Sequence, residues 1–401
     1  MFKIFIIISL ILSFTLYANP RYPFPTHMHY YEASSIKSIS HTKQIEYIKR
    51  YYDQFKDNFF VKDKDGYRVA NDKKDKRYTV SEGQGYGMMI IALMAGYDKD
   101  AKFIFDSMLN FAKSHPSSIN KNFMSWKVPT KKGDNDSAVD GDCDIAYALL
   151  LADKQWGSKG DINYKKEALK IIDALINSAV GEDSYLPLLG DWVEMNGKKY
   201  NQYTVRTSDF MLSHFKAFYR VSKDKRWLKV VKSCQNALKD IQALKSNGSK
   251  LVSDFIFYDK KSKHFKPTKR NFLEENDDSF SYNACRVPLR VAMDALFNND
   301  AISKKISMDM LKWIYTNSSK NPTHIYPGYR LSGKPIATDY HSVIFIAPFG
   351  VVSKLDREYQ DYLEQIFSLS VKSHENYFED SITLISLLVM IDAFWDPTLV
   401  E

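Results

Sequence analysis

Three carboxyl groups precede two strongly apolar segments of the sequence. Glu82 leads into "GQGYGMMIIALMAG", and Asp140 and Asp142 lead into "CDIAYALLLA". Apolar surroundings raise the pKa of a carboxyl, whereas neighbouring cations and hydrogen-bond donors keep a carboxyl ionised. Two carboxyls in such different surroundings can divide the roles of proton donor and charged partner. The three residues therefore predict proton-transfer chemistry.

Polar residues also stand at the starts of the other apolar segments. They are Ser208 and Asp209, Tyr282 and Asn283, Thr338 and Asp339, and the stretch 377–379. Each could serve only as a helix cap, because Ser, Asp and Asn accept hydrogen bonds from free backbone N–H groups. If the apolar helices all point the same way, however, these residues meet at one end and outline a cleft. Glycoside hydrolysis suits such a cleft, because it needs one protonated carboxyl and one carboxylate.

Helical periodicity dominates the elements that must position these residues. We expect twelve helices, at 41–56, 82–96, 100–114, 140–156, 163–179, 207–221, 224–244, 283–297, 301–317, 338–348, 355–370 and 379–395. Amphipathic segments alternate with segments that are apolar all round, and helices of the second kind are buried. This alternation predicts an all-α (α/α)6 barrel with an inner and an outer ring, and two helical layers without a ring are the alternative. Short strand-like pieces such as 254–258 lie in the connections.

The composition fits one catalytic domain spanning residues 19–401. The chain has 401 residues, of which 44% are hydrophobic, and no Gly/Ser-rich linker divides it. The net charge of +8 is spread along the chain, which favours a solvated surface over a nucleic-acid site. The three cysteines are far apart and no two histidines are spaced i, i+4 on a helix. We therefore expect neither a metal ion nor a cofactor.

The first 18 residues resemble a targeting segment. Lys3 precedes an apolar stretch that is short for a bilayer span, and Ala18 follows it before Asn19. This pattern predicts a signal peptide cleaved after Ala18, with an uncleaved anchor as the alternative. The mature protein is then expected in the periplasm or outside the cell, free of the membrane.

Aromatic residues near the acidic motifs are candidate sugar platforms. They are Trp126 in "NFMSWKVPT", Trp192 in "GDWVEM" and Tyr203 in "NQYTVRTSD". Each of these rings could instead belong to the hydrophobic core.

Two stretches resemble the signature blocks of glycoside hydrolase family 8. They are "SEGQGYGMMIIALMAGYD" (81–98) and "AVDGDCDIAYALLLADKQW" (138–156), which depart from the family pattern only at Val139, where Ser or Thr is usual. The family includes bacterial endoglucanases, lichenases, chitosanases and xylan-acting enzymes. The resemblance implies an (α/α)6 barrel, inversion at the anomeric carbon, Glu82 as general acid and Asp140 as the carboxylate that holds the distorted sugar, with Asp142 as a further substrate contact.

A third stretch, "SYNACRVPLR" (281–290), resembles a later block in which many members place the general base. Here that position is Asn283, which cannot accept a proton as a base does. The resemblance is to branches that carry Asn there, and chitosanase-like members recruit a Glu from the preceding loop. It implies Glu274 as base, with Glu275, Asp277 and Asp278 as rivals and a solvated acidic loop as the alternative. The expected substrate-binding residues are Asp142, Trp126, Tyr203, Asp209, Tyr282, Asn283, Arg286 and Tyr377.

The expected partner is a polysaccharide, bound by a monomer. An endo-acting enzyme on β-1,4-glucan or mixed-linkage glucan is the first interpretation. Chitosan is a polycation that a chain of charge +8 repels, unless the acidic loop at 274–278 attracts it locally. A chitosanase therefore remains an alternative, and Asn283 leaves open a noncatalytic polysaccharide-binding protein.

Overall fold

The computed structural model describes residues 19–31, 33–131 and 133–400, and these residues form twelve α-helices. The predicted signal peptide lies outside this range. The helices are α1 His41–Phe59, α2 Ser81–Leu93, α3 Ala101–Ser114, α4 Val139–Trp156, α5 Tyr164–Ser178, α6 Leu212–Ser222, α7 Arg226–Ala243, α8 Val287–Asn298, α9 Ala301–Asn317, α10 Ala347–Ser353, α11 Gln360–Ser370 and α12 Tyr377–Met390.

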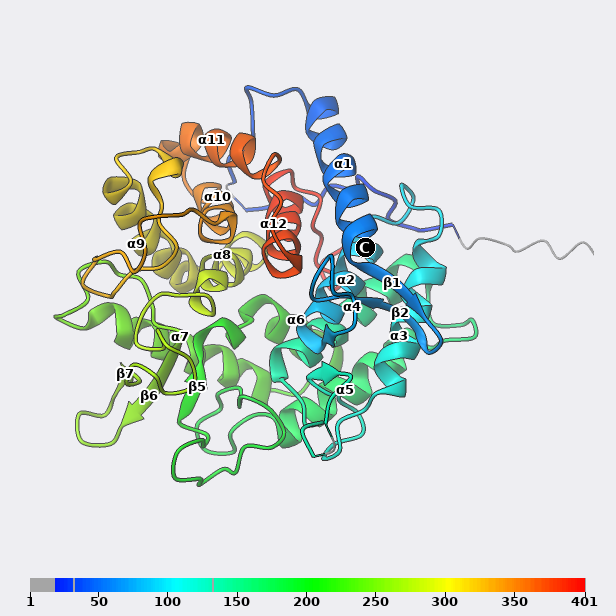
Figure 1. Ribbon diagram of the computed structural model, residues 1–401, viewed down its shortest axis with the longest axis horizontal. Helices are drawn as coiled ribbons and strands as arrows, with labels where there is room; N and C mark the ends of the chain where they lie inside the picture. The colour runs from blue at the N-terminus through cyan, green and yellow to red at the C-terminus, as the bar shows by residue number, and fades with distance from the viewer. Residues whose placement is uncertain (1–18, 32, 132, 401) are drawn as a thin grey trace, which may run out of the picture.

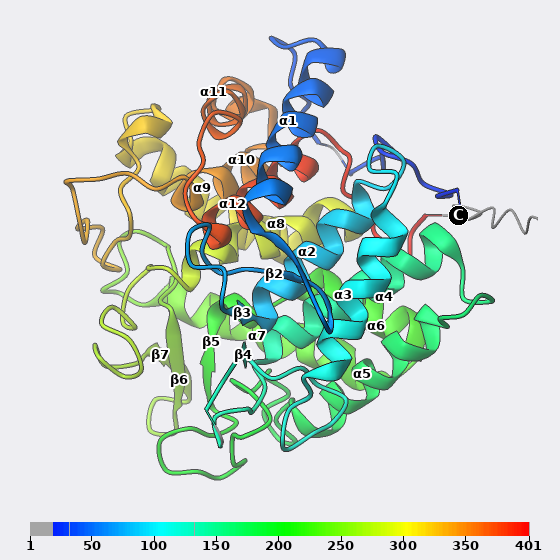
Figure 2. The same ribbon diagram turned by 45° about the vertical axis from the view of Figure 1, so that its right-hand side comes forward.

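The helices form two concentric rings (Figures 1 and 2). The even-numbered helices α2 to α12 each contact the next even-numbered helix, and α12 closes the inner ring on α2. The odd-numbered helices pack outside them, α1 on α12 and each later one on the inner helix that precedes it. This arrangement is the (α/α)6 barrel that the sequence predicts, and it excludes two layers without a ring.

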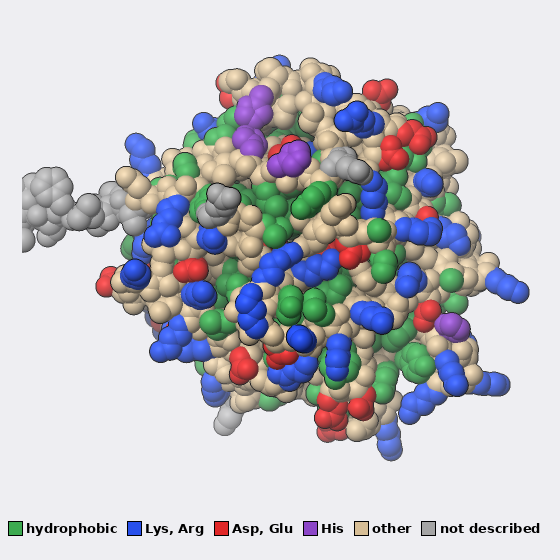
Figure 3. Space-filling view, turned by 180° about the vertical axis from the view of Figure 1, so that it is seen from behind, with side chains coloured by type: hydrophobic (Ala, Val, Ile, Leu, Met, Phe, Trp, Pro, Cys, Tyr) green, Lys and Arg blue, Asp and Glu red, His purple; other side chains and the backbone are tan. Residues whose placement is uncertain are grey.

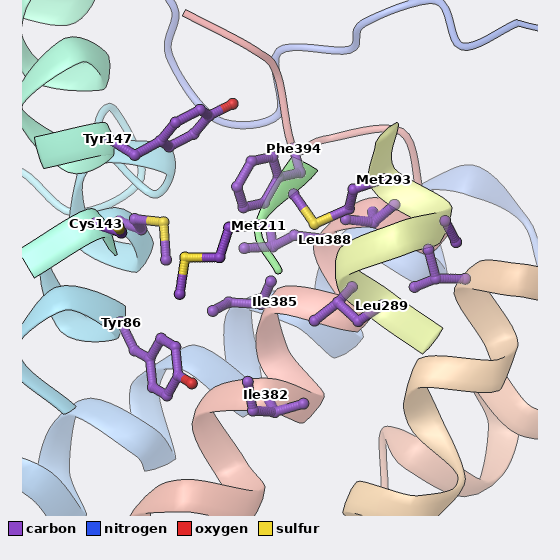
Figure 4. Close-up of a cluster of buried hydrophobic side chains, with 14 of the residues drawn as sticks. Tyr86, Cys143, Tyr147, Met211, Leu289, Met293, Ile382, Ile385, Leu388 and Phe394 are labelled. Carbon is purple, nitrogen blue, oxygen red and sulfur yellow. The ribbon is translucent and has the colours of Figure 1, made fainter. Parts of the chain in front are cut away.

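Apolar side chains fill the centre of the inner ring. Every residue of α2 except Glu82 is buried, and every residue of α12 from Glu379 onwards is buried too. Figure 4 shows Tyr86, Cys143, Leu289 and Ile385 gathered from four inner helices around one apolar core. Removing this surface from water is the main force that closes the ring. The polar residues at the helix starts are thereby held at the end of a rigid core.

Glycine allows α2 and α4 to pack closely. A Cβ atom on Gly85 would lie 2.7 Å from the Cβ of Asp144, and one on Gly141 would lie 2.6 Å from the carbonyl carbon of Ser81. Gly83 likewise faces the ring of Tyr377, and Gly87 faces Val69. At all four glycines the space that a Cβ would occupy is filled by a neighbouring segment of the chain.

A Gly85→Ala substitution should therefore destabilise the barrel. Alanine gains about 1 kcal/mol over glycine in helix propensity, but overpacking against the stiff stem of Asp144 costs up to about 3 kcal/mol. We expect a net loss of about 2 kcal/mol in the free energy of unfolding, measured by urea denaturation. Gly160→Ala is the matched control, because no heavy atom lies within 4 Å of a Cβ there. Equal stability of the two variants would contradict the packing argument.

Seven short strands lie in the connections between the described helices. They are β1 Phe60–Asp63, β2 Gly66–Val69, β3 Thr79–Val80, β4 Lys127–Val128, β5 Thr204–Arg206, β6 Phe255–Asp259 and β7 His264–Pro267, and all pairs are antiparallel. The strand-like piece predicted at 254–258 is β6. The β3–β4 pair carries Trp126 to the start of α2, where the Ser81 N–H donates to its carbonyl at 2.9 Å. The β5 strand delivers Arg206 to the start of the third inner helix.

Three inner helices begin differently from the prediction. Short 3-10 turns, η1 Thr207–Asp209 and η2 Ala284–Arg286, precede α6 and α8. The fifth inner helix, predicted at 338–348, begins only at Ala347, and Thr338 and Asp339 are exposed in the loop before it. Pro348 has no N–H to bond to residue 344, so a helix cannot run through it from upstream. Asp339 therefore does not join the other polar helix starts.

Charged residues cover the outside. Figure 3 shows Lys and Arg spread over one whole face, with acidic groups among them, rather than collected in a single basic patch. In the part of the chain that the structure describes, every helix is too short or too polar to cross a bilayer. All three cysteines are buried and unpaired.

Candidate active site

Arg286 joins the starts of four inner segments. Its guanidinium Nη1 donates to Glu82 Oε2 and, at 3.1 Å, to Asp140 Oδ2. Its Nη2 donates to Ser208 Oγ at 2.9 Å and to Asn283 Oδ1 at 3.1 Å. Arg286 is only 1% exposed. The structure thus brings together polar residues that the sequence places far apart.

A second, half-buried arginine completes an ion cluster around Asp140. Arg206 Nη2 lies 3.3 Å from Asp140 Oδ1, and its Nε donates to the two oxygens of Asp209 at 2.9 and 3.1 Å. Burial alone would raise the pKa of Asp140, but the charges of Arg206 and Arg286 outweigh it and hold that pKa below its usual value. Asp140 is therefore ionised at neutral pH. We call Glu82, Asp140, Arg206, Asp209 and Arg286 the ion cluster.

Glu82 is in the opposite electrostatic situation. The pKa of Glu82 is raised to about 7. Burial is the largest cause, the positive charge of Arg286 partly offsets it, and the negative charge of Asp140 adds to the rise. Its other oxygen, Oε1, accepts from the Tyr377 hydroxyl at 3.3 Å. With Glu82 protonated, two carboxylates face two guanidiniums and the charges of the ion cluster balance. Glu82 can thus hold a proton at neutral pH while Asp140 cannot.

Helix capping does not explain Glu82. The residues before α2 and α4 make no side-chain cap bond, and no helix N–H donates to Glu82. Asp140 accepts one N–H of its own helix, from Gly141 at 3.0 Å, in addition to the guanidinium contacts. The helix α12 does have a side-chain cap, but the cap is Asn376, which accepts from the N–H groups of Phe378 and Glu379, and not a residue of the stretch 377–379.

Glu274 is the acidic loop residue that reaches this network. Its Oε2 accepts from Asn283 Nδ2 at 3.3 Å, and Asn283 in turn accepts from Arg286. Glu274 is otherwise exposed. Asp277 is buried and accepts the N–H groups of Leu273 and Glu274, so it shapes the loop rather than facing the ion cluster.

The other two rivals are held by arginines outside the ion cluster. Glu275 pairs with Arg270 at 2.7 Å, and Asp278 pairs with Arg330 at 2.9 Å. These contacts favour Glu274 among the four acidic residues of the loop.

Some of the remaining sequence candidates lie close to the ion cluster or to Asn283, and others face other parts of the structure. Tyr377 contacts Glu82, and Trp126, at 39% exposed, lies beside the start of α2. Tyr282 is half-buried next to Asn283, with its hydroxyl 3.2 Å from that of Tyr340. Asp142 points elsewhere, because its Oδ1 accepts from the Met124 N–H at 2.9 Å.

Among the described residues, Trp192 and Tyr203 pack away from the ion cluster. Trp192 packs edge-on against Tyr200 in a small separate apolar cluster. Tyr203 lies 5.9 Å from Tyr258, ring centre to ring centre, and lines a hollow with Asp240 of the outer helix α7. Their platform role remains a prediction without support from these contacts.

Sequence reasoning missed Arg206, Asp254 and Phe378. Arg206 stands three residues before Asp209 in the polar stretch "NQYTVRTSD", where its position relative to Asp209 was the available signal. The Phe378 ring centre lies 5.2 Å from the Arg286 guanidinium carbon, a favourable cation–π contact. Asp254 precedes β6 and accepts four hydrogen bonds from residues 281–284, and nothing local marks it.

A barrel that holds a carboxyl able to carry a proton at neutral pH, an ionised carboxylate beside it and a third carboxylate on a loop fits one class of protein, the carboxylate-dependent glycosidases. Residues 20–391 match the model of the glycosyl hydrolases family 8, and the chain belongs to this family. The resemblance of the two signature blocks is thereby confirmed, and the protein is a glycosidase.

Relatives cover nearly the whole chain. It is 37% identical to a beta-glucanase of Niallia circulans over 387 residues, which are 94% of this chain and 92% of that protein. It is 36% identical to an endoglucanase of Bacillus sp. (strain KSM-330), over 94% of this chain and 82% of that protein. The apo structure of a beta-1,3-1,4-glucanase from Paenibacillus sp. X4 matches with a TM-score of 0.88 at 35% identity, over 94% of this chain and all of that chain.

Proposed function

We propose that this protein is an endo-acting glucanase that cleaves β-1,4 linkages in cellulose-like or mixed-linkage β-glucan with inversion. The observation that carries the proposal is the contact of Arg286 with both Glu82 and Asp140. This contact holds a carboxyl that can be protonated beside one that stays ionised. The names of the relatives, beta-glucanase, endoglucanase and beta-1,3-1,4-glucanase, support a glucan as the polymer.

Glu82 donates the proton to the leaving oxygen. Its Oε2 faces the Arg286 guanidinium, which only donates hydrogen bonds, so a proton on Oε2 is disfavoured. The proton therefore resides on Oε1, on the side of Tyr377. As the glycosidic C–O bond breaks, this proton passes from Oε1 to the departing sugar. Asp140 remains negative and stabilises the positive charge that develops on the sugar ring.

Glu274 acts as the base. It removes a proton from a water molecule that attacks the anomeric carbon from the face opposite the leaving group, which inverts the configuration. Inverting enzymes place acid and base about 6.5–9.5 Å apart to admit this water. The Asn283 contact supports Glu274, and we assign the chain to the branch of the family that carries Asn at this position.

Chitosan is the less favoured polymer. The chain has a net charge of +8, which repels a polycation at long range. The acidic loop offers little compensation, because Glu275 and Asp278 are already paired with Arg270 and Arg330.

A reducing-sugar assay on barley β-glucan, carboxymethylcellulose and chitosan tests the substrate. We expect product from the first two polymers, with a fast fall in viscosity because cleavage is internal, and little from chitosan. Proton NMR of the first product should show the α-anomer. Product from chitosan alone would establish the chitosanase alternative, and binding of glucan without any product would leave only a binding protein.

We also propose that the enzyme is exported and acts as a monomer. The N-terminal pattern supports cleavage after Ala18, so the N-terminal sequence of secreted protein should begin at Asn19.

A further inference from the structure

An unbroken hydrogen-bond chain connects the two residues that the proposed function assigns as acid and base. Arg286 donates to Glu82 through Nη1 and to Asn283 Oδ1 through Nη2, at 3.1 Å for the second contact. Asn283 Nδ2 then donates to Glu274 Oε2 at 3.3 Å. Asn283 is 6% exposed, so its amide is enclosed by these partners rather than by solvent.

Only an amide satisfies both neighbours of Asn283. Its oxygen faces a guanidinium, which has no acceptor, and its nitrogen faces carboxylates, which have no donor when ionised. A carboxylate at this position would keep the Arg286 contact but would put a third negative group beside Glu274 and Asp254. If the amide were flipped, its NH2 group would face the donors of the Arg286 guanidinium, and its oxygen would face the acceptors of the Glu274 carboxylate.

Asp254 holds the backbone that carries this amide. Its Oδ1 accepts the N–H groups of Ala284 at 2.7 Å and Ser281 at 2.9 Å. Its Oδ2 accepts from the Asn283 N–H at 3.3 Å and from Asn283 Nδ2 at 3.5 Å. Asp254 is 2% exposed. It thus fixes both the turn around Asn283 and the direction of the amide.

The main chain of Asp254 also connects the turn around Asn283 to the segment that carries Asp209 of the ion cluster. Its carbonyl accepts from the Thr207 N–H at 3.0 Å, at the start of η1, and its N–H donates to the Ser279 carbonyl at 2.8 Å. One residue therefore links the segment that carries Asp209 to the loop that carries Glu274.

We propose that Asp254 and Asn283 are positioning residues for the base, with Asp254 orienting the Asn283 amide and the amide holding Glu274 toward the attacking water. The proposal rests on the proposed function and explains why this chain carries Asn where a base could stand. Asn283 does not replace a lost base; it directs a base supplied by the preceding loop.

Two isosteric substitutions test the proposal. Asn283→Leu removes the donor to Glu274 without creating a carboxylate that could itself act as a base, and Asp254→Asn places an NH2 group against N–H donors. We expect each variant to lose about 10²-fold in kcat on mixed-linkage glucan oligosaccharides, the cost of misplacing a reacting group by about 1 Å. KM should change less than about threefold, because the sugar contacts remain. Asp259→Asn, at the far end of β6 and bonded to Lys266, is the matched control.

A chemical readout separates positioning from structural damage. Azide is a small nucleophile that needs no deprotonation, so it can replace the water and the base together. With an aryl glycoside whose leaving group needs no protonation, azide attacks the anomeric carbon, the aryl–oxygen anion departs, and an α-glycosyl azide forms. We expect azide to restore turnover in Asn283→Leu, in Asp254→Asn and in Glu274→Ala alike.

The outcomes are distinguishable. Wild-type kcat in both variants, with Glu274→Gln inactive, would overturn this proposal and leave the proposed function intact. A loss that azide does not restore would also overturn it, since the damage would then lie outside the base. An active Glu274→Gln enzyme would remove the base assignment and this proposal with it. If Asp254→Asn fails to fold, Asn283→Leu decides alone.

Discussion

Replacing Glu82 with Gln should reduce kcat on β-glucan by about 10³-fold or more, because the substitution removes the proton donor and keeps the shape. The Gln oxygen can still accept from Arg286, and the Gln NH2 group can donate to the Tyr377 hydroxyl, so the ion cluster keeps its geometry. Oligosaccharide binding by calorimetry and the free energy of unfolding should stay close to wild type. An aryl glycoside with a good leaving group should lose far less activity, because its departure needs no protonation.

The pH profile provides a second readout of the same residue. The pKa of Glu82 is raised to about 7, chiefly by burial, so the fraction that carries a proton falls as pH rises through that value. The wild-type enzyme should therefore lose kcat/KM above about pH 7, and Glu82→Gln should lack this alkaline limb. Substantial turnover of β-glucan by Glu82→Gln, or an unchanged alkaline limb, would rule out Glu82 as the acid.

Replacing Glu274 with Gln should also abolish hydrolysis, by about 10³-fold in kcat, because no group then accepts the proton of the attacking water. The adjacent Glu275→Gln is the matched control. Glu275 has a 71% exposed side chain that pairs with Arg270, outside the network, so its replacement should leave activity at the wild-type level.

The reverse result would identify a different base. An active Glu274→Gln enzyme with an inactive Glu275→Gln or Asp278→Asn would move the base along the loop without changing the family. Loss of activity in all three variants, with reduced stability, would show that the loop matters only as a folded unit.

Much of the fold was predictable because helix position and burial depend on nearby residues. The 3.6-residue periodicity located eleven of the twelve described helices, and the contrast between amphipathic and wholly apolar segments distinguished the outer ring from the inner ring. The exception, α10, starts late because Pro348 interrupts backbone bonding.

The candidate site was predictable only in part. Glu82 and Asp140 lie in the two signature blocks, so the sequence pointed to them directly. Arg206 ends the three-residue strand β5 and Asp254 directly precedes β6, in connections too short to show a periodic pattern. Tyr203 was expected near the sugar because of its chain neighbours, yet β5 carries it toward the outer helix α7.

The sequence by itself determined the family, the helical repeat and which carboxyls are available for chemistry. The closed barrel decided whether these carboxyls are ionised. It brings Arg286 into contact with Glu82, 204 residues away in the sequence, and with Asp140, 146 residues away. The tertiary structure also decided which loop carboxylate meets Asn283. The physical reason is that a pKa depends on burial and on charges a few ångströms away, and those neighbours come together only when the inner ring closes.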